Sequence, residues 1–134
     1  MTGAETKQSA KFPKKERLCS RKVLDALFTS GESFAMHPVR VVWLETELPE
    51  DVPVQVVMSV PKKRVKKAVE RNQIKRQMQE AWRMHKWELC DALKAQNKQW
   101  ALMLIYTGKA PLEHHIAQEK IILILQRLIK TIAS

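Results

Sequence analysis

The side chains with the clearest chemistry in this sequence lie between Lys62 and Arg83. This segment contains nine Lys or Arg residues and two Glu, a net charge of +7, whereas the whole chain of 134 residues carries +10. Lysine and arginine bind phosphate groups, and the planar guanidinium of arginine can donate two parallel hydrogen bonds to one phosphate. Such a concentration of one sign favours a binding surface for a polyanion, above all nucleic acid, over a surface that only aids solubility.

From about residue 69 onward, this segment predicts a helix with two different faces. At 100° per residue, one stripe is apolar and the opposite stripe is polar. The apolar stripe holds Ile74, Met78, Ala81 and His85, with Trp82 beside it. The polar stripe holds Asn72, Arg76, Gln79 and Arg83, with Lys75 on its flank. The alternative is a solvated face with i, i+4 ion pairs, but such faces alternate in sign, and only Glu70 and Glu80 are acidic here.

The elements expected before this helix are a first helix and a pair of strands. Ser20 can cap a helix whose apolar residues repeat with helical spacing up to a stop at Gly31. The β-branched runs at 39–44 and 54–60 predict two strands, and the short proline-containing loop between them predicts a hairpin. Residues 33–37 can add an edge strand to this hairpin.

After the basic helix, the sequence predicts a buried strand and a final helix. Residues 100–106 are uninterruptedly apolar, as expected at a central position in a sheet, and residues 113–131 repeat with helical spacing. The resulting order is αβββαβα, an α+β sandwich in which helices pack on a small, mostly antiparallel sheet. We expect a single RNA-binding domain over residues 12–134, preceded by a polar, patternless and flexible tail at residues 1–11.

Three motifs in and before the basic helix resemble those of the bacterial ribonuclease P protein family. They read Ser59-Val-Pro-Lys-Lys63, Ala68-Val-Glu-Arg-Asn72 and Ile74-Lys-Arg76, followed by Glu80. In that family a strand ends in Ser-Val-x-Lys-Lys, and a helix opens with Ala-Val-x-Arg-Asn-Arg-x-Lys-Arg. The flanking residues agree as well, because Phe12 and Arg17-Leu18 precede the first helix, and Phe28 and Gly31 close it.

The resemblance implies an accessory protein subunit of an endoribonuclease whose RNA subunit is the catalyst. In that family the RNA holds the Mg²⁺ ions that release the 5′ leader from precursor tRNA. The small basic protein is a monomer in a 1:1 ribonucleoprotein; it binds that RNA and contacts the leader. Carried over to this chain, the RNA-binding residues are Arg17, Lys62, Lys63, Lys66, Lys67, Arg71, Asn72, Lys75, Arg76 and Arg83. The leader cleft, between the first helix and the sheet, would hold Phe12, Phe28 and Trp43.

Some residues depart from the family pattern. Gln73 and Gln79 stand where the family usually has arginine, so two phosphate contacts are lost, which Lys66 and Lys67 can replace. Leu24 stands where the family often has an aromatic residue toward the leader cleft. The resemblance also implies a left-handed crossover between the strands on either side of the basic helix, although about 98% of such crossovers are right-handed.

Other features of the sequence point away from protein-based catalysis and from a metal site in the protein. There is no Ser/His/Asp or paired-carboxylate arrangement, and the adjacent His114 and His115 have no third ligand nearby. Cys19 and Cys90 have no metal-ligand spacing, which is typical of reduced thiols in a cytoplasmic protein. No apolar run approaches the roughly 20 residues of a membrane span, so we expect a soluble, cytoplasmic protein.

Two alternative functions for the basic helix are considered, and then the expected positions of the tryptophans and of Lys86. A non-enzymatic structured-RNA or ribosome-associated protein could use the same basic helix, whereas a DNA-binding helix-turn-helix is disfavoured because a strand precedes that helix. Among the tryptophans, we expect Trp82 and Trp100 in the core. Lys86 lies beyond the motifs, and we expect it to be a diffuse surface charge, unlike Arg76.

Overall fold

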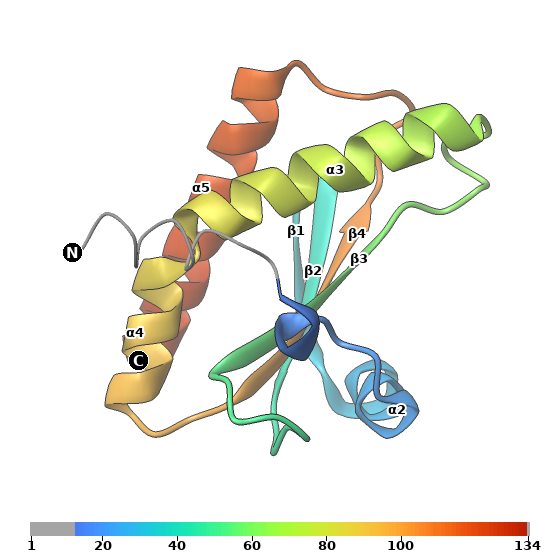
Figure 1. The fold of residues 1–134 in the computed structure, drawn as a ribbon. Coiled ribbons are helices and arrows are strands. Elements are labelled where there is room, and N and C mark those ends of the chain that lie inside the picture. Colours follow the sequence, from blue (N-terminus) through green and yellow to red (C-terminus); the bar gives the residue numbers. More distant parts are fainter. Residues whose placement is uncertain (1–12, 134) are drawn as a thin grey trace.

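A computed structural model describes residues 13–133 and confirms the expected elements in their expected order, with the short helix η1 and the helix α4 in addition (Figure 1). In chain order they are the 3-10 helix η1 (Lys14–Glu16), α2 (Arg21–Ser30), β1 (Glu32–Met36), β2 (Val39–Glu45), β3 (Val54–Ser59), α3 (Ala68–His85), α4 (Trp87–Ala95), β4 (Trp100–Tyr106) and α5 (His114–Ala133). The possible edge strand is present as β1. Phe12 and the tail predicted at residues 1–11 lie outside the described residues.

The predicted hairpin between the strands at 39–44 and 54–60 is wrong. The four strands lie in the order β1-β2-β4-β3, so β4 separates β2 from β3. β1 pairs with β2 and β2 with β4 in antiparallel fashion, whereas β3 and β4 are parallel. The physical reason is the composition of β4: a strand without polar side chains is stable only when it is covered on both faces and paired on both edges. The sheet is therefore mostly antiparallel, and its hairpin is β1–β2.

The two faces of the sheet carry two separate apolar clusters. The larger cluster lies between the sheet and α3, α4 and α5, and both Trp82 and Trp100 belong to it, as expected. The smaller cluster lies under α2, which packs on β2 and β4. Its fully buried members are Leu18, Val23, Leu27, Ala101 and Met103. Figure 1 shows α4 and α5 to one side of the strands and α2 to the other.

The basic region connects the two parallel strands. The chain leaves β3, passes through α3 and α4, and returns as β4, so a βαβ unit is present as the resemblance implies. The left-handed sense of this crossover stays a prediction. The helical segment after the motifs consists of two helices, because α3 ends at His85 and α4 begins at Trp87.

The first helix begins and ends where the sequence predicts. The Oγ of Ser20 accepts a hydrogen bond from the backbone N–H of Val23 at 3.3 Å, which caps the helix. Gly31 ends it, but not through a left-handed backbone, since its φ is −69°. A Cβ at Gly31 would lie 2.5 Å from the carbonyl oxygen of Leu27 and 2.9 Å from Val42. Glycine is therefore required here for the close approach of the helix end to β2.

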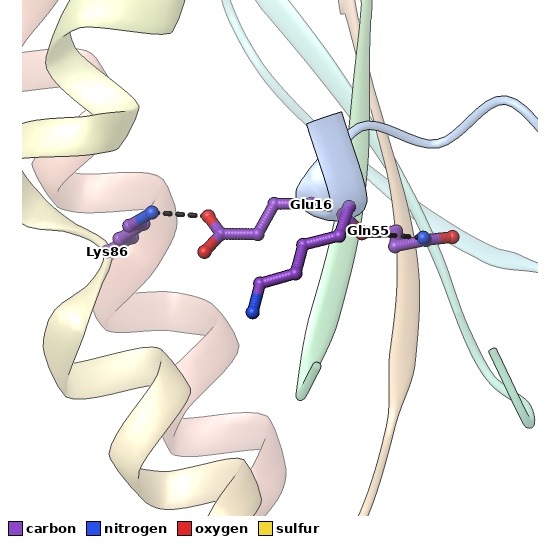
Figure 2. Close-up of polar contacts among 4 residues, drawn as sticks. Glu16, Gln55 and Lys86 are labelled. Atoms are coloured by element: carbon purple, nitrogen blue, oxygen red, sulfur yellow. Dashed lines mark hydrogen bonds and ion pairs between the residues drawn. The ribbon is translucent and has the colours of Figure 1, made fainter. Parts of the chain in front are cut away.

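Lys86 is fully buried, so the prediction that it is a diffuse surface charge is wrong. It lies at the junction between α3 and α4, where the periodicity of α3 no longer determines which way a side chain points. Its ammonium pairs with the carboxylate of Glu16, 70 residues away, and lies 4.8 Å from the ring centroid of Trp87 (Figure 2). A buried ammonium needs such compensation, because desolvation strongly disfavours an isolated charge. The pair attaches η1 to the α3–α4 junction.

We expect the substitution Lys86→Ala to lower the free energy of unfolding by about 2–4 kcal/mol, because it removes the ion pair and leaves a cavity. Urea denaturation measures this loss. The matched control is Lys94→Ala on α4, which removes an exposed lysine from a helix and should change stability by less than about 0.5 kcal/mol. Equal losses for the two variants would contradict a structural role for the buried pair.

The two cysteines are both unpaired but differ in environment. Cys19 is exposed and Cys90 is buried next to Lys86. Burial raises the pKa of the Cys90 thiol to about 11, and the carboxylate of Glu16 adds to this effect, whereas the charge of Lys86 opposes it. Since the thiolate is the reactive form, Cys90 is poorly reactive at neutral pH.

We expect a thiol reagent at pH 8 to modify Cys19 and to leave Cys90 intact in the native protein, because the Cys90 thiolate is present there at on the order of one part in a thousand. The number of reactive thiols per protein molecule is measured from the absorbance of the chromophore that an aromatic disulfide reagent releases. In urea, where burial is lost, both thiols should react. Rapid modification of two thiols in the native protein would contradict the burial of Cys90.

Candidate nucleic-acid interface

The helix α3 has the two faces that its sequence predicts. Its inner stripe is fully buried: Ile74, Met78, Ala81 and Trp82 are each at most 3% exposed. The stripe ends earlier than expected, because His85 is only half-buried and its Nε2 lies 2.7 Å from the Oε1 of Gln118. The outer face carries the predicted polar residues, with Asn72, Lys75 and Arg76 exposed and Gln79 and Arg83 half-buried.

The loop between β3 and α3 extends this polar face. Its four predicted lysines, Lys62, Lys63, Lys66 and Lys67, are all exposed. Its apolar residue Val65 is 1% exposed and belongs to the main core. The loop is thus anchored by one buried side chain, while its lysines point into solvent next to the first turn of α3.

Two arginines hold the loop in place through hydrogen bonds to backbone carbonyl groups. The Nη1 of Arg71, in the first turn of α3, donates hydrogen bonds to the carbonyl oxygens of Val65 and Lys66 at 3.0 and 2.8 Å. The Nη1 of Arg64 donates to the carbonyl oxygen of Thr107, at the end of β4, at 3.2 Å. Arg71 therefore holds the loop as well as adding charge. Arg64 is a part of this surface that we did not predict from the sequence, although it stands in the same basic run.

Arg17 is exposed but lies apart from the other predicted RNA-binding residues. It forms an isolated parallel bridge with Val56, in the middle of β3, whereas the lysine loop follows the end of that strand. The structure thus brings together the cations of the loop and α3 as one surface, from Lys62 to Arg83, and places Arg17 at the edge of the sheet.

The predicted leader residues do not share one face of the sheet. Phe28, on α2, is 70% exposed, and the small apolar cluster lies under that helix. Trp43 faces the opposite side, where it stacks on Trp100 with a centroid distance of 4.4 Å and an angle of 19°. Because side chains alternate along a strand, Val42 and not Trp43 faces α2. The prediction that Trp43 lies in a cleft between the first helix and the sheet is therefore wrong. Phe12, the third predicted leader residue, lies outside the described residues.

Residues 13–133 contain neither a metal-binding cluster nor a membrane-spanning helix. Within this part of the chain, no three His, Cys, Asp or Glu side chains gather in a group that could hold a metal ion. None of its helices combines the length and the apolar character needed to cross a membrane.

The fold and the surface together define a class of protein: a small basic α+β domain that offers a cationic helix and loop suited to a polyanion. Residues 12–123 match the sequence profile of the family described as Ribonuclease P, which is most of the chain. The chain belongs to the ribonuclease P protein family.

Individual relatives agree with this assignment. The ribonuclease P protein component of Porphyromonas gingivalis, in two strains, is 37% identical over 81 residues. The match spans 60% of this chain and 59% of the relative's length. The solved RNase P protein of Staphylococcus aureus superposes with a TM-score of 0.65 at 21% identity, over 88% of this chain and 95% of the other. That of Thermotoga maritima gives 0.66 at 22%, over 84% and 96%. These two structures support the fold.

We expect Arg76→Ala and Lys75→Ala each to weaken binding to a bacterial ribonuclease P RNA, by about tenfold for Arg76, because each removes an exposed cation from the outer face of α3. The matched control is Lys94→Ala, which should cost less than about threefold. Filter binding across a salt series measures both effects. If about six phosphates are neutralised, log K should fall against log salt with a slope on the order of −4 to −5.

Lys86 cannot serve as the control for this comparison, since its removal changes the core. Equal losses for the α3 variants and Lys94→Ala would mean that α3 is only a solvated basic face. A salt slope near zero would mean that these cations do not contact the RNA.

Proposed function

We propose that this chain is the protein subunit of ribonuclease P and assists the removal of the 5′ leader from precursor tRNA. The observation that carries the proposal is the family match over residues 12–123, which includes the whole basic surface. The same match favours this function over the ribosome-associated alternative. The charge of the chain and its concentration between Lys62 and Arg83 support a nucleic-acid partner.

The catalytic RNA would lie against α3 and the lysine loop. Asn72, Lys75 and Arg76 are exposed on a rigid helix, so the distances between their polar groups are set before binding. Arg64 and Arg71 fix the middle of the loop, at residues 64–66, so its lysines are also held in one region. A surface prepared in this way needs little reordering when it neutralises phosphates, which favours binding with a defined register over diffuse attraction.

The leader would lie beside α2. Phe28 offers an exposed aromatic ring, and Val57 and Ile105 are half-buried on the same face of the sheet. Aromatic rings stack on unpaired bases without strong sequence preference, as binding to leaders of many sequences would require. Leu24 is half-buried under the same helix and adds apolar surface where the family often has a second aromatic.

The chemistry of cleavage would belong to the RNA subunit. Mg²⁺ bound by that RNA would supply an activated water for cleavage of the phosphodiester. The described residues do not fit such an ion, because no cluster of three acidic or imidazole ligands is present in residues 13–133 and the exposed surface near α3 is cationic. This chain would therefore bind and orient RNA, as a monomer in a 1:1 complex. We also place it in the cytoplasm, where its two unpaired thiols would stay reduced.

Reconstitution with a bacterial ribonuclease P RNA tests the proposal. We expect the protein to restore accurate 5′ cleavage of a precursor tRNA at a Mg²⁺ concentration at which the RNA alone is inactive, because its cations offset phosphate repulsion that the metal must otherwise screen. The protein without RNA should not cleave at any Mg²⁺ concentration. Site-specific cleavage by the protein alone, free of contaminating nuclease, would contradict the proposal, and so would a failure to stimulate the RNA.

A further inference from the structure

The outer edge of β1 has no partner strand among the described residues. β1 stands at the end of the strand order β1-β2-β4-β3 and pairs with β2. The opposite edge of the sheet, on β3, is partly covered, because Arg17 forms a bridge with Val56 there. An edge strand exposes a row of unpaired N–H and C=O groups, which can pair with a further strand. The edge of β1 is therefore a place where another chain can add to the sheet.

The sequence of β1 contains none of the devices that commonly block such pairing. It reads Glu32-Ser-Phe-Ala-Met36, without lysine or proline, and it pairs with β2 in a regular register without a bulge. Ser33 and Ala35 are small and exposed on the face of the sheet that carries α2. Phe34 and Met36 are half-buried on the other face. The backbone and the side chains of β1 are thus compatible with a second strand.

Exposed charges of both signs lie beside this edge, on the face that carries α5. The guanidinium of Arg127 lies 4.2 Å from the ring centroid of Phe34, and this arginine is exposed. Leu123, one helical turn before Arg127, is 44% exposed. Glu32 is exposed and lies on the same face as Phe34, because it pairs with Trp43, which packs against the main core. The edge thus offers an anion, a cation and an apolar side chain on one face.

A second copy of this chain has the charges that complement this edge. An antiparallel pair of β1 strands that matches all five residues places Phe34 opposite Phe34 and Glu32 opposite Met36. Glu32 is then the diagonal neighbour of Phe34 in the second copy, at about 7–8 Å, which long side chains span. Arg127 of the second copy lies over that ring, so it faces Glu32. The two-fold symmetry forms this ion pair twice.

Neither charge is paired within the described part of the chain. In residues 13–133, neither Glu32 nor Arg127 forms an ion pair. The lysine loop follows β3, which is three strand spacings of about 4.8 Å from β1. Charges farther apart than about 8 Å are largely screened at physiological salt. The cations of that loop therefore oppose contact between two β1 edges only weakly.

We propose that the RNA-free protein forms a symmetric dimer through the antiparallel pairing of its β1 strands. Backbone hydrogen bonds join the two four-stranded sheets into one. Glu32 of each copy pairs with Arg127 of the other, and Leu123, one turn from Arg127, adds apolar surface to the contact.

This dimer is independent of the function proposed above and compatible with it. A contact built on a five-residue strand is small, and such contacts give weak, concentration-dependent association. The concentrated free protein therefore pairs, whereas the protein at the far lower concentration of its complex with RNA is a monomer. Because β1 and β3 are opposite edges of the sheet, the lysine loop after β3 stays accessible in the dimer.

Sedimentation equilibrium of the full chain without RNA tests the proposal over a series of protein concentrations. The mass should rise from 15.6 kDa toward twice that value. Glu32→Arg and Arg127→Glu each place like charges across the axis, and each should weaken the dimer by about tenfold or more. The double variant exchanges the two charges and should restore the affinity to within about threefold. The matched control Glu88→Arg changes an exposed glutamate on α4 and should equal the wild type.

Hydrogen exchange of the wild-type protein identifies the surface that joins the copies. The backbone amides of residues 32–36 should exchange more slowly as the protein concentration rises, whereas those of α3 should not change. A monomer at every concentration would overturn the inference. A dimer in which exchange at residues 32–36 stays the same would also overturn it, because another surface would then join the copies. Failure of the double variant to restore the dimer would exclude the proposed ion pair. None of these results bears on the proposed function, which stimulation of the RNA tests separately.

Discussion

The buried pair between Lys86 and Glu16 is the constraint on which the arrangement of this protein depends. A lysine ammonium cannot stay in an apolar interior without a partner, so the end of α3 and the segment before α2 must meet. That contact joins residues 70 positions apart and lays the η1 segment along the outer edge of β3. This segment covers part of an edge that would otherwise expose unpaired backbone groups.

The order of the strands sets the two surfaces that this fold offers. Because β4 lies between β2 and β3, the chain must leave β3, cross the sheet through α3 and α4, and return. One face of α3 is buried in that crossover. Its other face stays in solvent, and the helix fixes the spacing of the cations on it. The opposite face of the sheet is covered only in part, by α2, which leaves Val57 and Ile105 half-buried, while Phe28 on α2 itself is exposed. Two accessible surfaces thus follow from one topology.

Within the cationic surface, not every charged residue has the same role. Arg71 and Arg64 each donate to backbone carbonyl groups and so define the shape of the lysine loop. Lys75 and Arg76 extend from the helix and are exposed. The distinction matters for mutational data, because loss of a loop-holding arginine alters the position of several lysines, whereas loss of an exposed one removes a single charge.

The sequence by itself determined α2, α3, α5, the strands and the two faces of α3, but not α4, because helical and strand periodicities are local and buried stripes repeat along the chain. It also identified the family, since the motifs from Ser59 to Arg76 are contiguous. Only the tertiary structure decided that β4 separates β2 from β3, that Trp43 faces the main core, and that Lys86 is buried. Strand order, the face of a strand and the partner of a charge all depend on segments distant in the chain, and local periodicity carries no information about them. The open edge of β1 belongs to the same group, because an edge is visible only when the order of the strands is known.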